Sequence, residues 1–264
     1  MLANLNTMEI ITKEQVKLVA PSVFTKTGSK SVSDKYSHIP TERVMDDMSA
    51  LGWNVVDAKE IKARKNQGFQ KHMLIFANPE IVIEGKDGDT VFPLILLTNS
   101  HDGKNAFSFQ AGLFRLVCSN GLIIADEQFG KMKIRHMGYD FEALQSLITQ
   151  IVEKLPLTVE SMNKFKKTQL SQEQKQRFAL EALGLRFDTE NKTFNVDEFL
   201  TPTRKEDKGN DLWSVFNLIQ EKLVGGMVEY SSGSKIRKAR RIKNFQQDIK
   251  LNSELYELAL EYAQ

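Results

Sequence analysis

The chain has 264 residues, of which 41% are hydrophobic and 27% are charged, a composition typical of a globular protein. The longest apolar run, residues 92–97, is too short to span a bilayer, and the first fifteen residues lack the apolar stretch of a secretory signal. A single cysteine excludes an internal disulfide framework and favours a reducing compartment, so we expect a cytoplasmic protein with no membrane partner.

The first half of the chain predicts one short helix and then a run of strands. Polar residues dominate up to residue 40, where Thr41 predicts the cap of a helix that stops at Gly52. Asp-Gly pairs at 87–88 and 102–103 and the Asn-Gly pair at 120–121 predict hairpin turns. The predicted strands are 53–64, 71–78, 81–85, 90–100, 105–120, 121–127 and 130–138.

The second half predicts helices. Apolar residues recur at spacings of three and four in 141–155, which should stop before Pro156, and further helices are expected at 171–187, 211–226 and 253–263. Strands followed by helices indicate an α+β fold: a central antiparallel β-meander, a long packing helix and a helical C-terminal region. We expect an N-terminal extension at 1–35, an α+β core at 36–156 and a helical region with a basic segment at 157–264.

The net charge of +2 hides a local cluster of positive charge. "KIRKARRIK" (235–243) holds six Lys or Arg and no acid, and it follows a Gly-Gly pair that predicts a mobile start. Such clusters bind phosphate backbones through counterion release. The alternative is the solvated face of a helix. The predicted phosphate contacts are Lys235, Arg237, Lys238, Arg240, Arg241 and Lys243, with a second basic surface of Arg64, Lys65, Lys71 and Arg135 and stacking residues Trp53 and Phe69.

The chemistry-bearing residues give weaker patterns. Cys118 sits in a predicted buried strand, so packing is the favoured interpretation. The four histidines form no close pair with metal-ligand spacing, and no glycine-rich nucleotide loop is present, so neither metal, cofactor nor ATP is expected. A hydrolase that uses His101, Asp102, His136 and Cys118 remains as a third hypothesis, and it requires these side chains to converge.

Three segments together resemble a known family. These are residues 36–59, "FRLVCSNGLI" (114–123) followed by "IRHMG" (134–138), and the Trp-Asn-Glu helix at 211–226 with residues 249–262. Together they resemble the phage- and plasmid-like domain of unknown function 932. The resemblance implies a phage or mobile-element origin and assigns no catalytic residue. The order of a helix ending in Gly52-Trp53, a meander and a long helix is also similar to single-strand annealing proteins, which assemble into rings or filaments on DNA.

The sequence therefore predicts a non-enzymatic phage or mobile-element protein that binds single-stranded DNA, anneals strands without ATP and assembles with copies of itself. The alternative is a non-catalytic factor that binds a host protein, for host takeover or against host defence, with the basic cluster serving only solubility or steering.

Overall fold

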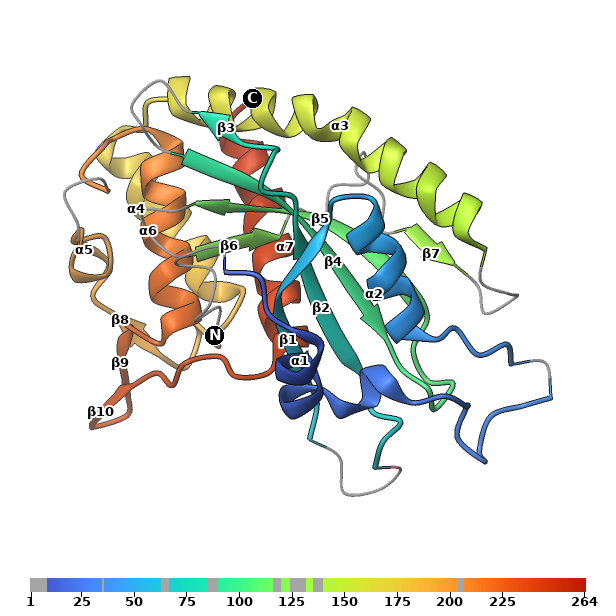
Figure 1. The fold of residues 1–264 in the computed structure, drawn as a ribbon. Helices are drawn as coiled ribbons and strands as arrows, with labels where there is room; N and C mark the ends of the chain where they lie inside the picture. Colours follow the sequence, from blue (N-terminus) through green and yellow to red (C-terminus); the bar gives the residue numbers. More distant parts are fainter. Residues whose placement is uncertain are drawn as a thin grey trace. The chain divides into compact units, whose positions relative to one another are not determined.

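The computed structural model describes residues 9–34, 36–62, 67–84, 90–115, 120–123, 132–134, 140–203 and 207–264. The chain forms two compact units, residues 1–155 and 156–264. The first unit carries an antiparallel sheet and the second is mostly helical, so the predicted α+β class is confirmed (Figure 1). Residues 13–24 fall in the predicted N-terminal extension (1–35); they belong to the first unit, where α1 contacts β1 and η2 contacts α2.

The first unit is built on antiparallel pairs between strands that follow one another closely in sequence. Its sheet has the order β1-β2-β4-β5-β6, with β3 on β4 and β7 on β5. Its elements are α1 (Lys13–Val19), η2 (Pro21–Phe24), α2 (Thr41–Ala50), β1 (Asn54–Glu60), β2 (His72–Ala77), β3 (Ile83–Glu84), β4 (Thr90–Asn99), β5 (Phe107–Arg115), β6 (Asn120–Ile123), β7 (Met132–Ile134) and the first part of α3 (Phe141–Lys167).

The core of the first unit lies on both faces of its central strands. All residues of β2 are buried, as are Leu94 to Leu97 of β4. Because successive side chains of a strand point to opposite faces, this pattern shows that both faces are covered. The first two helices pack against β1, and the amide of Ile11 donates to the carbonyl of Val55 at 2.9 Å.

Three local predictions for this half are wrong. Thr41 does not cap α2: the N-cap is Pro40, and the Thr41 hydroxyl is used by a buried histidine described below. Asn120 and Gly121 are paired with Arg115 and Phe114 in β6, so this dipeptide is strand and not turn. Helix α3 does not stop before Pro156, because apolar positions continue beyond it to the buried residues Met162 and Phe165 and their burial outweighs the donor lost at proline.

The second unit packs helices around an aromatic core and adds a small sheet of order β10-β9-β8. Phe165, Phe216 and Tyr256 meet in the core, with ring centroids 6.1 and 5.7 Å from Phe165. Its elements are the end of α3, α4 (Gln172–Gly184), β8 (Thr193–Phe194), α5 (Val196–Phe199), α6 (Leu212–Gly225), β9 (Glu229–Ser232), β10 (Lys235–Lys238) and α7 (Phe245–Tyr262) (Figure 1).

The caps of α4 and α6 are as predicted, but the last helix is longer than predicted. Ser171 caps α4, Asp211 caps α6, and Gly226 ends α6 in the left-handed conformation. Helix α7 begins after Asn244 and not at Ser253, whose hydroxyl donates to the carbonyl of Ile249 inside the helix at 2.9 Å. The Asn244 side chain accepts the amide of Gln246 and so starts the helix two turns earlier.

Candidate nucleic-acid interface

The basic segment, residues 235–243, is a strand followed by a stretch without regular secondary structure, and not a helix. Its first part is β10, paired with β9 across the turn at Gly233, and its second part leads to the start of α7 (Figure 1). The predicted phosphate contacts are all exposed, three on β10 and three after it: Lys235, Arg237 and Lys238, then Arg240, Arg241 and Lys243.

The backbone of residues 239–242 is held against the C-terminal end of α6. The amide of Ala239 donates to the carbonyl of Val228 at 2.8 Å, and the amide of Ile242 donates to the carbonyl of Val224 at 3.0 Å. The guanidinium of Arg186 donates to the carbonyls of Leu223 and Arg240. The bonds to Leu223 and Val224 satisfy carbonyls of the last turn of α6, which no residue of the helix itself can reach. The basic segment is therefore docked by its backbone, which leaves its charged side chains outside.

Gly226 makes this close approach possible. Its φ is +74°, and a Cβ built on it would lie 2.5 Å from the carbonyl carbon of Arg240 and from the amide nitrogen of Arg241. Contacts that short with backbone atoms cannot be relieved by a side-chain rotation. Glycine is thus required at this position both by the backbone conformation and by the segment that lies against it.

Five cations line a pocket of about 430 Å³ beside the docked stretch. Two of its walls are the basic segment and the first turns of α7, and the third is the chain that follows α4. Burial lowers the pKa of Arg186, whose donors are directed at the two carbonyls. The lining residues are Leu185, Arg186, Arg240, Arg241, Ile242, Lys243, Gln247, Lys250, Leu251 and Glu254.

An aromatic cluster shares the small sheet with β10. The rings of Phe187, Phe194 and Tyr230 are half-buried and lie 5.4 to 5.9 Å apart by centroid. Tyr230 pairs with Phe194 on one side and with Arg237 on the other, so these three side chains share one face of the sheet. The ammonium of Lys192 lies 5.3 Å from the Tyr230 ring centroid. Sequence reasoning missed this cluster, because strand pairing brings Phe194 to Tyr230 and the chain after α4 brings Phe187 to both.

The two predicted stacking residues, Trp53 and Phe69, lie in the first unit and differ in their exposure. Trp53 is 2% exposed, so it offers no ring face to a base, and it takes no part in the proposal below. Its burial follows from its place between α2 and β1, where its amide donates to the carbonyl of Met48 at 2.9 Å. Phe69 and Lys71 are half-buried. The other three cations predicted for a second basic surface, Arg64, Lys65 and Arg135, lie outside the described residues.

A buried histidine organises the polar interior of the first unit. Nδ1 of His72 lies 3.1 Å from the carbonyl oxygen of Gln70 and 2.9 Å from Oγ of Ser22, and Nε2 lies 2.9 Å from Oγ1 of Thr41. Since a carbonyl only accepts, Nδ1 carries the proton and Nε2 accepts from the Thr41 hydroxyl, which itself accepts from Asn99 at 2.9 Å. Burial lowers the pKa of His72 to about 4, so the ring is neutral at pH 7.

Two of the four residues of the hydrolase hypothesis, His101 and Asp102, lie in the described residues. His101 is fully buried, with its ring centroid 5.1 Å from that of His72 and 4.5 Å from that of His38. Its carbonyl accepts the amide of Ser29 at 2.8 Å, which ties two loops together. The other two side chains of that hypothesis, His136 and Cys118, lie outside the described residues.

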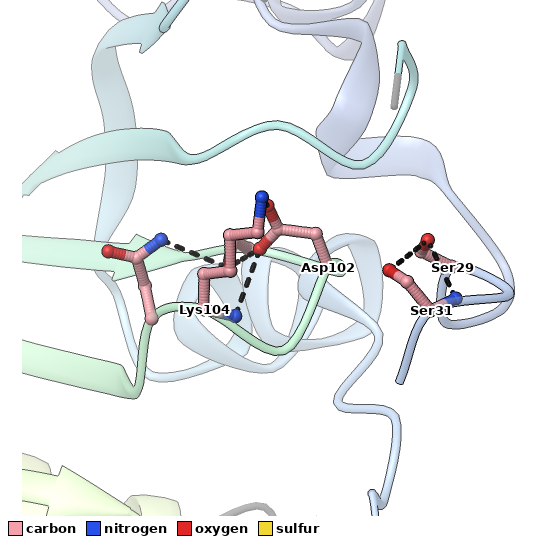
Figure 2. Close-up of polar contacts among 6 residues, drawn as sticks. Ser29, Ser31, Asp102 and Lys104 are labelled. Carbon is pink, nitrogen blue, oxygen red and sulfur yellow. Dashed lines mark hydrogen bonds and ion pairs between the residues drawn. The ribbon is translucent and has the colours of Figure 1, made fainter. Parts of the chain in front are cut away.

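The contacts of the Asp102 carboxylate are with residues of its own turn. One carboxylate oxygen accepts the hydroxyl of Ser100 at 2.9 Å and the amide of Lys104 at 3.1 Å, and the Lys104 ammonium lies 4.0 Å from the other. Figure 2 shows the contacts of the Asp102 carboxylate with Lys104, and the hydrogen bonds between Ser29 and Ser31 on the neighbouring loop. These contacts are those of an aspartate that stabilises a tight turn.

The sequence matches the model of the family described as Domain of unknown function (DUF932) over residues 29–256, and the chain belongs to that family. It is similar to two proteins of Escherichia coli (strain K12), the UPF0380 proteins YfjQ and YafZ, each 30% identical over 255 residues that cover 94% of this chain and 90% of the relative. No solved structure matches.

The described residues contain no group of three or more histidine, cysteine, aspartate or glutamate side chains placed to hold a metal ion. No described helix has both the length and the apolar character that crossing a membrane requires.

Proposed function

We propose that this protein binds single-stranded DNA through the basic segment and the sheet that carries it. The observation that carries the proposal is the docking of the segment: the backbone of residues 239–242 is bonded to Val224 and Val228 at and just after the end of α6, while all six cations of the segment remain exposed. A surface of this kind neutralises several phosphates at once and releases their counterions.

Docking of the basic segment lowers the entropic cost of binding DNA, because a mobile segment would have to be ordered on binding. Each immobilised long side chain costs about 0.5–1.5 kcal/mol on binding, and an unanchored nine-residue tail would add the ordering of its backbone. Here the backbone of residues 239–242 is already fixed by its own hydrogen bonds. Only the Lys and Arg side chains need to be ordered on contact with phosphate.

The aromatic cluster favours single strands over duplex. Unpaired bases stack on aromatic rings, whereas the bases of a duplex are already stacked on each other. Phe194 and Tyr230 lie in the same row of the sheet as Arg237, so a base and its phosphate can be reached from one face. Stacking of this type tolerates any base, which suits binding without sequence preference.

The wider role that we propose is in the DNA of phages and mobile elements, with annealing of complementary strands and no use of ATP. Its support is the order of elements in the first unit: a helix that ends at Gly52-Trp53, an antiparallel meander and the long helix α3. That order is similar to the core of single-strand annealing proteins, in which copies of the chain assemble on DNA.

Charge reversal tests the proposal. The variant with Arg237→Glu, Arg240→Glu and Arg241→Glu should weaken binding of a labelled single strand and flatten its salt dependence. Each phosphate contact on a single strand contributes about −0.7 to the slope of log K against log salt, so losing three contacts should reduce the slope by about 2. Gel shifts or fluorescence anisotropy from about 50 to 200 mM salt measure it.

The control has the same net charge and leaves the interface intact. It reverses three exposed lysines of the second unit that lie outside the basic segment and its pocket: Lys164, Lys167 and Lys208. The control should keep the wild-type slope. If wild type fails to shift single strands at low salt, the proposal is wrong, and capture of a host protein that resists nuclease treatment would favour the protein-binding alternative.

A further inference from the structure

The pocket beside the docked stretch holds more positive charge than an internal phosphate can use. Five cations line it against a single carboxylate, that of Glu254. The Glu254 carboxylate lies 3.5 Å from the Lys250 ammonium, on the next turn of the same helix. Three more of the lining cations, Arg240, Arg241 and Lys243, belong to the basic segment. Within the described residues, these three form no ion pair.

Gathering like charges around one cavity costs free energy, and an anion in the cavity offsets that cost. An internal phosphodiester brings one negative charge and continues as a chain on both sides. A terminal phosphomonoester brings a charge of about −1.5 to −2 near pH 7, and its free side lets it approach more of the lining cations than an internal phosphodiester can. Gln247, in the first turn of the 18-residue helix α7, also lines the pocket, and near that end the helix dipole adds to the attraction of an anion.

We propose that this pocket binds the terminal phosphate of a DNA single strand, with Arg240, Arg241, Lys243 and Lys250 as the cations that contact it. This inference rests on the function proposed above and adds a preference for strand ends. The apolar lining residues Leu185, Ile242 and Leu251 give the sugar of the terminal nucleotide a surface to pack on. Arg186 acts as a positioning residue, because its donors hold the carbonyl of Arg240.

The test compares oligonucleotides of one sequence that differ only at an end: a 5′-phosphate, a 3′-phosphate, or hydroxyls at both ends, with the dye placed internally. One phosphorylated end should bind at least about tenfold tighter than the hydroxyl form, the gain of an added charge-assisted hydrogen bond. The pocket variant Arg241→Gln with Lys243→Gln should abolish this preference. The matched variant Lys235→Gln with Arg237→Gln, on β10 and outside the pocket, should weaken all oligonucleotides alike and keep the preference.

Each result bears on one proposal. Equal binding of phosphorylated and hydroxyl ends overturns the end-binding inference and leaves single-strand binding in place. Absence of binding by every oligonucleotide overturns the proposed function instead. If inorganic phosphate or a mononucleotide displaces the phosphorylated strand at equal concentration, the pocket is a site for small free phosphates and the assignment to strand ends is wrong.

Discussion

Replacing Gly226 by alanine tests whether the basic segment is docked as the structure shows. Adding a Cβ to a residue in the left-handed conformation destabilises the fold by about 1–2 kcal/mol. The new methyl group would also sit 2.5 Å from two backbone atoms, of Arg240 and Arg241, and moving a packed backbone costs about 1–3 kcal/mol more. We therefore expect Gly226→Ala to lower the free energy of unfolding by about 2–5 kcal/mol.

Gly233→Ala is the matched control. Its φ is +61°, so it carries the same conformational cost, but no atom lies within 4 Å of the added Cβ. The difference between the two variants isolates the close approach, at about 1–3 kcal/mol. The hydrogen bonds from Ala239 and Ile242 are at risk in Gly226→Ala alone, because they depend on the segment staying against α6.

The two tryptophans provide a readout for each unit, since Trp53 lies in the first and Trp213 in the second and both are buried. In a Trp53→Phe background, urea unfolding followed by fluorescence reports the second unit only. DNA binding should fall in Gly226→Ala although all six cations are present. Equal destabilisation by Gly226→Ala and Gly233→Ala would refute the docking argument.

Two further predictions concern acid stability and base stacking. The pKa of His72 is about 4 in the fold and about 6.5 in the unfolded chain, so between these pH values the unfolded chain binds more protons than the folded one. The neutral ring therefore contributes its whole stabilisation above pH 6.5, and the free energy of unfolding of the first unit should fall by about 3 kcal/mol towards pH 4. His72→Gln, followed through Trp53 in a Trp213→Phe background, should flatten that profile, and an unchanged profile would mean that other groups cause the acid sensitivity. Tyr230→Leu should weaken binding of single strands by about 1–3 kcal/mol for one lost stacked base, whereas Trp53→Phe should leave it unchanged; equal effects would remove the stacking face.

Local signals predicted the elements that are bounded by their own sequence. The cap residues Ser171 and Asp211 and the glycine at 226 placed α4 and α6 correctly, because a cap acts within one turn of its helix. The run of strands followed by helices, and with it the α+β class, was predicted from the same short-range patterns. Pro156 misled the prediction, since a proline usually ends a helix, whereas α3 continues past it to the buried residues Met162 and Phe165.

The candidate site depended on contacts that sequence spacing does not show. "KIRKARRIK" has only two isoleucines and no clear period, and Ile236 is 77% exposed, so its own pattern favours neither strand nor docking. Its conformation is set by β9, by the end of α6 and by Arg186, which is 54 residues away from Arg240 along the chain. Aromatic residues gave the converse error: Trp53 met the sequence pattern for stacking and is core, while Tyr230 stands beside the cations.

The glycine pair at 225–226 shows how one feature can support opposite interpretations. By sequence it marks a helix end and predicts that the basic residues after it are mobile. In the fold, residues 239–242 lie against Gly226, and their amides donate to the carbonyl of Val224 in the last turn of α6 and to that of Val228 just beyond it. A helix terminus carries unsatisfied carbonyls wherever it ends, so a returning basic segment stabilises it by bonding and by charge. The same contacts that complete α6 thus fix the spacing of the cations, and this links the stability of the second unit to its proposed binding of DNA.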